Sequence, residues 1–230
     1  MSVKVVDVET ELFRLIPSRF PPVQVFEGLV ANDRLETLAE VESRTNPRLI
    51  SNDHLRATLS PTANRLQNFN HAPFKYINPE GSRFFPPFPP AVEMADCRQT
   101  ALAAAVARRA HFLGQTSEAP TGLDMRMLKT PVRARLADLT DVSPTASRDE
   151  CRERAKALPE NVDGIVYLSP DRPSNLSYAI LNGDVLGYTL QTAHFRFWWD
   201  GRRIAGIYAF ENAQHLDPAQ LVRPGEVLAA

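Results

Sequence analysis

Residues 78–113, NPEGSRFFPPFPPAVEMADCRQTALAAAVARRAHFL, contain the part of the sequence that decides the fold. They begin as a loop rich in proline and glycine, continue through the short apolar run 91–95, and end in a helix-forming pattern. Asp96 is placed to cap this helix and Gly114 to end it. Loop, strand and helix together bring Arg83 into a corner where a small-molecule site can form. The simpler alternative, which residue types alone favour, is a plain strand–helix unit with a solvated Arg83.

The predicted helix has one apolar face, and position 104 lies beside that face. The residues that recur at helical spacing and predict a buried stripe are Ala101, Leu102, Ala105, Val106 and Phe112. Ala104 lies between Ala101 and Arg108 on an adjoining face, from which a longer side chain would project into a neighbouring pocket. Alanine suits a helix at this position, so the fold does not need a larger residue there.

The composition predicts one domain with no excess of positive charge. The chain has 230 residues, of which 43% are hydrophobic, and this supports one sizeable core, so we expect residues 1–230 to form a single domain. The net charge of −1 argues against direct nucleic-acid binding. Arginine clusters at 108–109 and 152–154 are interpreted as solvated helix faces.

The sequence predicts a cytoplasmic protein without a metal site. Cys97 and Cys151 are the two cysteines; they lie far apart without a CxxC motif, so we expect reduced thiols. The residues His54 and His71 are interpreted as structural because neither has an evident partner. No apolar run approaches about 18 residues and no signal-peptide core is present, so we expect no membrane span. The sequence leaves a homo-oligomer open.

Strands and helices alternate along the rest of the chain. Strands are expected at 12–16, 123–139, 165–168 and 178–186, and helices at 32–43, 61–66 and 147–158. The segment 123–139 predicts either two strands or one strand bent at Pro131. Ser147 and Glu150 form a capping box. Asp200-Gly201 predicts a type I′ turn in a hairpin over 195–210, and no element is expected after Glu211.

Two further positions have both a functional and a structural interpretation. Ser169 ends the predicted strand 165–168 without a Gly-x-Ser-x-Gly elbow, so it is either a hydrogen-bond donor to a phosphate or ribose or a plain turn serine. Phe74 and Tyr76 precede the central loop and either stack on a planar ring or belong to the core, and aromatic residues in such places more often belong to the core.

Several motifs in a fixed order resemble the RES domain family. They are GSRF at 81–84, TALA at 100–103 and DGIVYLS at 163–169, with RFPP at 19–22, TNPRL at 45–49, APF at 72–74 and WDG at 199–201. The resemblance covers roughly residues 12–210. It implies an α+β fold similar to that of ADP-ribosyltransferases, with mixed, mostly antiparallel sheets and flanking helices. Members are mostly bacterial toxins of toxin–antitoxin pairs, and they attack NAD by hydrolysis, phosphorolysis or ADP-ribosyl transfer.

The resemblance also assigns site residues, and this chain departs from the family at three of them. The family's arginine and serine fall on Arg83 and Ser169, whereas its glutamate falls on Ala104. A family tyrosine falls on Glu93, and a histidine common in one branch falls on Tyr76. The residues expected to act in catalysis are therefore Arg83, Glu93 and Ser169, with Ala104 at the position of the missing carboxylate.

By the same resemblance, NAD is expected to be the substrate, and the residues expected to bind it are Arg83, Tyr76, Ser169 and Arg172. Glu93 is either a replacement carboxylate or a structural partner of Arg83. The resemblance further implies an Xre-type antitoxin that covers the cleft and binds operator DNA.

Three functional hypotheses follow. The first is a RES-type toxin whose NAD-cleaving activity is weakened or abolished by Ala104. The second is a catalytically inactive RES-like binding module, and the third is an unrelated α+β domain. Natural loss of the glutamate and deliberate replacement of it would leave the same alanine.

Overall fold

The computed structural model describes residues 3–18, 68–75, 77–223, 225 and 227–228. The helices expected at 32–43 and 61–66 lie outside these residues, as do His54 and Tyr76. Within the described ranges, no helix has the length and apolar composition needed to cross a membrane.

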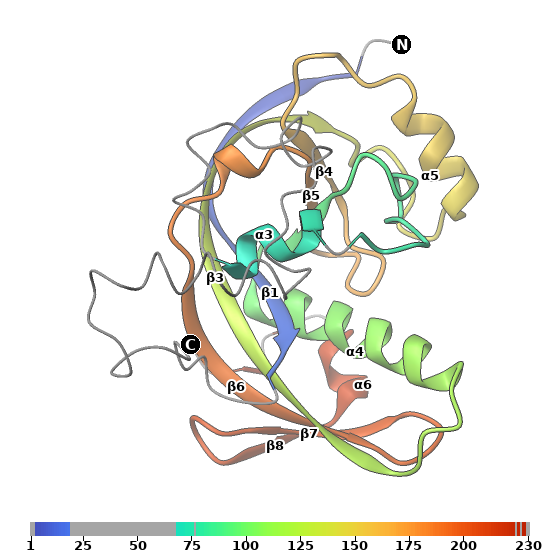
Figure 1. Ribbon diagram of the computed structural model, residues 1–230, viewed down its shortest axis with the longest axis vertical. Coiled ribbons are helices and arrows are strands. Elements are labelled where there is room, and N and C mark those ends of the chain that lie inside the picture. Colours follow the sequence, from blue (N-terminus) through green and yellow to red (C-terminus); the bar gives the residue numbers. More distant parts are fainter. Residues whose placement is uncertain (1–2, 19–67, 76, 224, 226, 229–230) are drawn as a thin grey trace, which may run out of the picture.

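One mixed sheet dominates the molecule. Its strands are β1 Val5–Pro17, β2 Val92–Ala95, β3 Thr121–Asp138, β4 Gly164–Leu168, β5 Leu176–Ile180, β6 Leu190–Trp199, β7 Ile204–Ala209 and β8 Gln214–Leu216. They form an eight-stranded sheet in the order β1-β2-β5-β4-β3-β6-β7-β8, strongly curved in Figure 1. Strands β3 and β4 pair in parallel, and the other described pairs are antiparallel. The α+β fold with a mixed, mostly antiparallel sheet is confirmed.

Part of the sheet closes on itself. Strand β1 pairs with β3 as well as with β2, so that β1, β2, β5, β4 and β3 form a ring. The 18-residue β3 belongs to this ring and then continues beside β6. Pro131 does not divide β3. It lies beyond the last pair between β3 and β6, Lys129↔Leu190, so β6 makes no hydrogen bond that would need the N–H that proline lacks.

Four helices and three apolar clusters complete the described structure. The helices are α3 Asn68–Lys75, α4 Arg98–Gly114, α5 Arg148–Ala155 and α6 Pro218–Leu221. Helix α4 packs on the extension of the sheet with Leu102, Phe197 and Trp199. Phe74 of α3 joins a second cluster with the ring strands. A third cluster joins Cys151 of α5 to β4. Phe74 is 1% exposed and belongs to the core, as the structural interpretation expected.

The start of α4 differs from the prediction, whereas the helix ends at Gly114 as expected. Cys97, not Asp96, caps the helix, with its sulfur accepting from the Thr100 N–H at 3.5 Å. The Asp96 carboxylate accepts from the Leu176 N–H at 2.8 Å instead, so it ties the start of α4 to β5. Gly114 is the last helical residue and Gln115 is the C-cap. Phe112 is 57% exposed rather than buried, because the apolar stripe passes through Leu113.

Three other predicted segments need correction, and one is confirmed. Strand β5 ends at Ile180 and is followed by the short 3-10 helix Gly183–Val185, not by further strand. The hairpin of β6 and β7 is confirmed, but its turn spans 200–203, where Asp200 accepts from the N–H groups at 202 and 203, each at 2.8 Å. The tail forms β8 and α6, which were not predicted. The capping box of Ser147 is confirmed, and its helix ends at Ala155.

Candidate functional site

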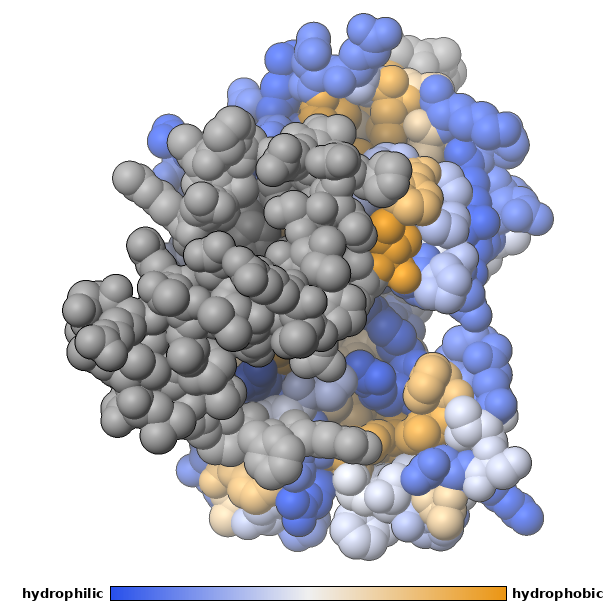
Figure 2. Space-filling view, in the orientation of Figure 1, coloured by the Kyte–Doolittle hydropathy of each residue, from blue (hydrophilic) through white to orange (hydrophobic). Residues whose placement is uncertain are grey.

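A cleft of about 640 Å³ lies between loop 78–91 and α4, with residues of β2 and β4 in its lining. Figure 1 shows α4 and α5 on either side of the loop, and in Figure 2 the surface is hollowed between these parts. The volume is in the range of about 300–1,000 Å³ that is usual for small-molecule sites. The charged residues in the lining are Arg14, Arg83, Arg108, Arg109, Arg148, Glu80, Glu93 and Asp171. Arginines therefore outnumber carboxylates in a cleft of a chain whose net charge is −1.

Loop 78–91 is held in one conformation by its own contacts. Asn78 donates from its side-chain amide to the carbonyl of Gly81 at 2.7 Å. Gly81 has φ 71°, and a Cβ there would lie 2.4 Å from the carbonyl oxygen of Phe85, so no other residue fits. Phe84 is buried and its ring lies 4.7 Å from that of Tyr167 on β4. The loop is thus anchored on both sides of Arg83.

Arg83 ties the loop to the segment before α5. Its Nη2 donates to three carbonyls within 143–146, at 2.7, 2.9 and 3.4 Å. A second arginine makes the same connection in the other direction: Arg152 of α5 donates to the carbonyl of Glu80 in the loop at 2.6 Å. Arg83 also lines the cleft. Because the carbonyls fix one terminal nitrogen, the guanidinium is positioned before any ligand arrives.

Glu93 lines the cleft from β2, with Arg108 of α4 as its partner. The two side chains form an ion pair at 3.4 Å. The expected alternative, a structural pair between Glu93 and Arg83, is not found among the described residues, since Arg83 is bound to the carbonyls at 143–146. Arg108 lies one helical turn after position 104 and extends from the same wall.

Ala104 forms an uncharged part of the helical wall. It lines the cleft together with Ala101, Ala105 and Arg108. This confirms the prediction that position 104 adjoins a pocket beside the buried stripe. The methyl group offers no proton acceptor, so any carboxylate chemistry in the cleft has to come from elsewhere.

Ser169 and Arg172 do not line the cleft, contrary to the roles expected for them at a bound dinucleotide. Ser169 is 0% exposed, and its Oγ has no hydrogen-bond partner in the described part of the chain. Arg172 is 5% exposed and donates to the carbonyl of Gly225 at 2.8 Å and to the Cys97 sulfur at 3.6 Å. Arg172 is not available to the cleft because it binds the carbonyl of Gly225, in the tail beyond α6, and the N-cap residue of α4.

Several cleft residues were not anticipated from the sequence, and Tyr167 and Asp171 are two of them. Tyr167 lies in the apolar strand 165–168, where alternation places it on the same face as Ile165 but does not indicate that this face meets a cleft. Asp171 follows Pro170 in a loop, where no periodic pattern in the sequence indicates which way the side chain points. Burial raises the pKa of Tyr167 well above its ordinary value, and the nearby charge of Glu93 reinforces this.

The electrostatics of the cleft favour an anionic ligand. Burial, with a smaller effect of Arg108, lowers the pKa of Arg14 to about 10 and also lowers the pKa of Arg109. Arginine remains cationic at neutral pH even so, and an anion placed among these groups would offset their mutual repulsion. Within the described ranges, no group of three or more His, Cys, Asp or Glu side chains is arranged to hold a metal ion.

Comparison with known proteins gives two matches. A family model described as the RES domain matches residues 62–200. A protein of Sinorhizobium fredii (strain NBRC 101917 / NGR234) that is described as the uncharacterized protein y4oC is 54% identical over 209 residues, which is 90% of this chain and 91% of that protein. The residues matched by the family model include loop 78–91, β2, α4 and β4, which line the cleft together with residues of β1 that lie outside the match.

Proposed function

This chain belongs to the RES domain family, and from that premise we propose that its cleft binds NAD and breaks the bond between nicotinamide and ribose. The observation that carries the proposal is that Arg83, Glu93 and position 104 converge on one arginine-rich cleft. Water, phosphate or a protein side chain then accepts the ADP-ribosyl group, which gives hydrolysis, phosphorolysis or transfer.

The residues have distinct tasks in this proposal. Arg83 contacts the diphosphate, because its planar guanidinium matches phosphate oxygens and the backbone carbonyls already orient it. Arg109, half-buried and without an ion pair among the described residues, adds a second cation for the same anionic ligand. Cleavage develops positive charge on the ribose, and this charge needs a carboxylate near the anomeric carbon, as in glycosidases. Glu93 remains a candidate for that task, although Arg108 holds it at 3.4 Å.

Ala104 favours a second candidate function, a RES-like module that binds without catalysis. The family's glutamate would extend from this position into the cleft, and alanine leaves the wall without charge. In this alternative the protein keeps NAD, or only a protein partner, on the same surface.

The biological setting is the part of the proposal that rests on family membership alone. As a RES-type toxin the protein acts in the cytoplasm and is neutralised by an Xre-type antitoxin that covers the cleft. Co-purification of the two proteins, with NAD cleavage suppressed in the complex, is the result expected for such a pair.

The test of catalysis is nicotinamide release by the wild type, Ala104→Glu and Ala104→Gln, with calorimetric titration of NAD into each. Glutamine matches glutamate in size but lacks its charge, so it controls for filling the cleft. We expect all three proteins to bind NAD and Ala104→Glu to release nicotinamide at least about 10-fold faster than Ala104→Gln, since positioned carboxylates contribute roughly 100-fold or more. Absence of NAD binding in all three would reject the proposal. Binding without release, even in Ala104→Glu, would favour the non-catalytic module.

A further inference from the structure

Among the described residues, three carboxylates line the cleft, and they differ in the side chains that bind them. Glu80 lies 3.7 Å from Arg148 with its side chain half-exposed. Glu93 lies 3.4 Å from Arg108 with 25% of its side chain exposed. The side chain of Asp171 has neither a hydrogen bond nor an ion pair with another described residue, and it is partly buried. Asp171 is therefore the cleft carboxylate whose oxygens are available to a ligand or to water.

Asp171 is also well placed relative to the other cleft groups. It follows the carboxyl end of β4, three residues after Leu168, and Tyr167 of that strand also lines the cleft. The charges that act on Asp171 come from Arg108 on α4, Glu93 on β2 and Arg83 in loop 78–91. These groups, Asp171 and Ala104 line the same cleft, so Asp171 shares the pocket into which a glutamate at 104 would extend.

We propose that Asp171 supplies the carboxylate that Ala104 cannot, acting at the ribose when NAD occupies the cleft. The inference rests on the proposed function and names a catalytic residue for it. Glu93, neutralised by Arg108, has a positioning role in this arrangement: it ties the side chain of Arg108 to β2.

The chemical step needs only NAD and water as reactants. The bond between C1′ of the ribose and N1 of nicotinamide breaks, and its electron pair leaves with nicotinamide, which becomes neutral. Asp171, ionised, stabilises the positive charge on the ribose and takes a proton from the water whose oxygen bonds to C1′. That proton passes to solvent, and the products are ADP-ribose, nicotinamide and one proton. Nothing is oxidised or reduced.

The surroundings of Asp171 suit a group that accepts a proton. Burial raises its pKa above the ordinary value, Glu93 reinforces the rise, and Arg108 and Arg83 oppose it. A raised pKa makes the carboxylate a stronger base once it is ionised. The ionised form is the active one, so nicotinamide release should fall as the pH drops through that raised pKa.

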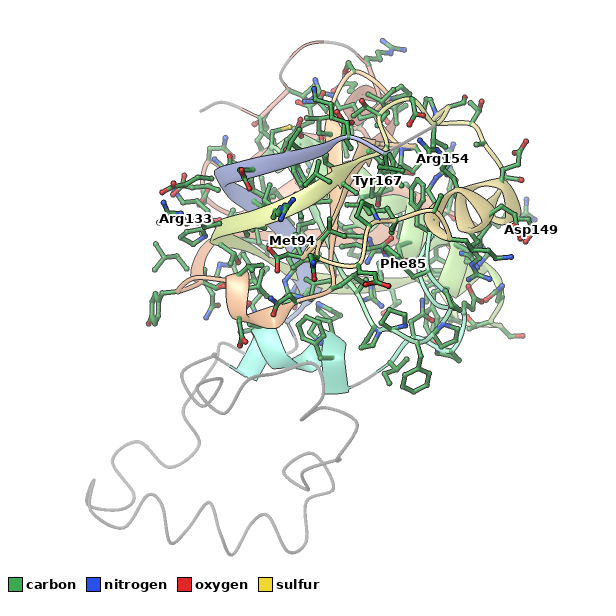
Figure 3. The ribbon with its side chains drawn as sticks, turned by 90° about the horizontal axis from the view of Figure 1, so that it is seen from above. Phe85, Met94, Arg133, Asp149, Arg154 and Tyr167 are labelled. Carbon is green, nitrogen blue, oxygen red and sulfur yellow. The ribbon has the colours of Figure 1, made fainter. Side chains whose placement is uncertain are left out.

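The test compares the wild type with Asp171→Asn, Asp171→Glu and Asp149→Asn. Asp149 is a matched control, because it lies on α5 with an exposed side chain and points away from Tyr167 in Figure 3. We expect Asp171→Asn to lose roughly 100-fold or more of the rate of nicotinamide release while its Kd for NAD changes less than about 3-fold. Asp171→Glu should retain more activity than Asp171→Asn and keep the acid limb of the pH profile. Asp149→Asn should match the wild type.

The outcomes separate this inference from the function on which it rests. If the wild type does not bind NAD, the proposed function itself fails. If the wild type binds NAD but only Ala104→Glu releases nicotinamide, the NAD-binding part of the proposed function stands, its catalytic part fails for the wild type, and Asp171 is not the carboxylate. Undiminished release by a folded Asp171→Asn would likewise overturn the assignment to Asp171.

Discussion

At the scale of single residues, the sequence predicted a site residue where a motif fixes its position. It did not predict residues whose position depends on tertiary structure. Arg83, Glu93 and Ala104 were placed at one corner by the order of loop, strand and helix, and all three line the cleft. Asp171 could not be found this way, because a loop residue after proline has no periodicity. Ser169 and Arg172 were expected in the site, but the tail that encloses Arg172 carries no pattern that predicts its path.

Gly164, the first residue of β4, shows how tightly a single position in the sheet is constrained. A Cβ on Gly164 would lie 2.2 Å from the carbonyl oxygen of Ala179 on β5, whereas nothing lies within 4 Å of a Cβ on Gly206 of β7. Gly164→Ala should therefore lower the free energy of unfolding by about 1–3 kcal/mol or more, because β4 and β5 must move apart. Gly206→Ala should change it by less than about 0.5 kcal/mol. Denaturant titration measures both, and similar midpoints would contradict the packing described for β4.

At the scale of elements, local signals predicted the existence of strands and helices better than their ends. The capping box at Ser147 and the apolar strand 165–168 were found because each depends on neighbouring residues. The cap of α4 was missed, since Asp96 is recruited by the Leu176 N–H from a distant strand and Cys97 takes its place. Pro131 lies inside a continuous β3 because the adjoining strand has already ended there.

Among the contacts between elements, the hydrogen bonds from Arg152 of α5 to loop 78–91, called the latch below, matter most for the site. Arg152 donates to the carbonyls of Glu80, Ser82 and Phe85 at 2.6, 3.4 and 3.4 Å. Arg154, on the same helix, forms an ion pair with the exposed Asp141 at 3.0 Å. Arg152→Met should cost roughly 1–3 kcal/mol of unfolding free energy, since hydrogen bonds from a charged group are lost, whereas Arg154→Met should cost less than about 1 kcal/mol.

Urea unfolding followed by circular dichroism gives the two free energies, and the far-UV spectrum of each variant confirms that α5 is retained. Arg152→Met should also weaken NAD binding, because the loop that orients Arg83 would be less fixed. Equal losses in the two variants would mean that the latch adds nothing beyond a surface ion pair.

At the scale of the whole molecule, the distribution of charge matters more than its sum. The near-neutral composition predicted no general affinity for polyanions, yet the described structure gathers five arginines, Arg14, Arg83, Arg108, Arg109 and Arg148, in the lining of one cleft. The sequence predicted a solvated helix face at Arg108 and Arg109. The side chain of Arg108 is 59% exposed, and the position of α4 beside the ring of strands also brings both arginines into the lining of the cleft. A compact anion can thus be selected by a protein with no overall positive charge.

The measurement that tests the central claim most directly is a calorimetric titration of NAD into the wild-type protein at about 50 mM and about 500 mM salt. The arrangement predicts saturable binding at one site per chain, weaker by several-fold at the higher salt because screening acts on the arginine–phosphate attraction. Failure to bind NAD at either salt concentration would contradict the claim that this cleft is a dinucleotide site.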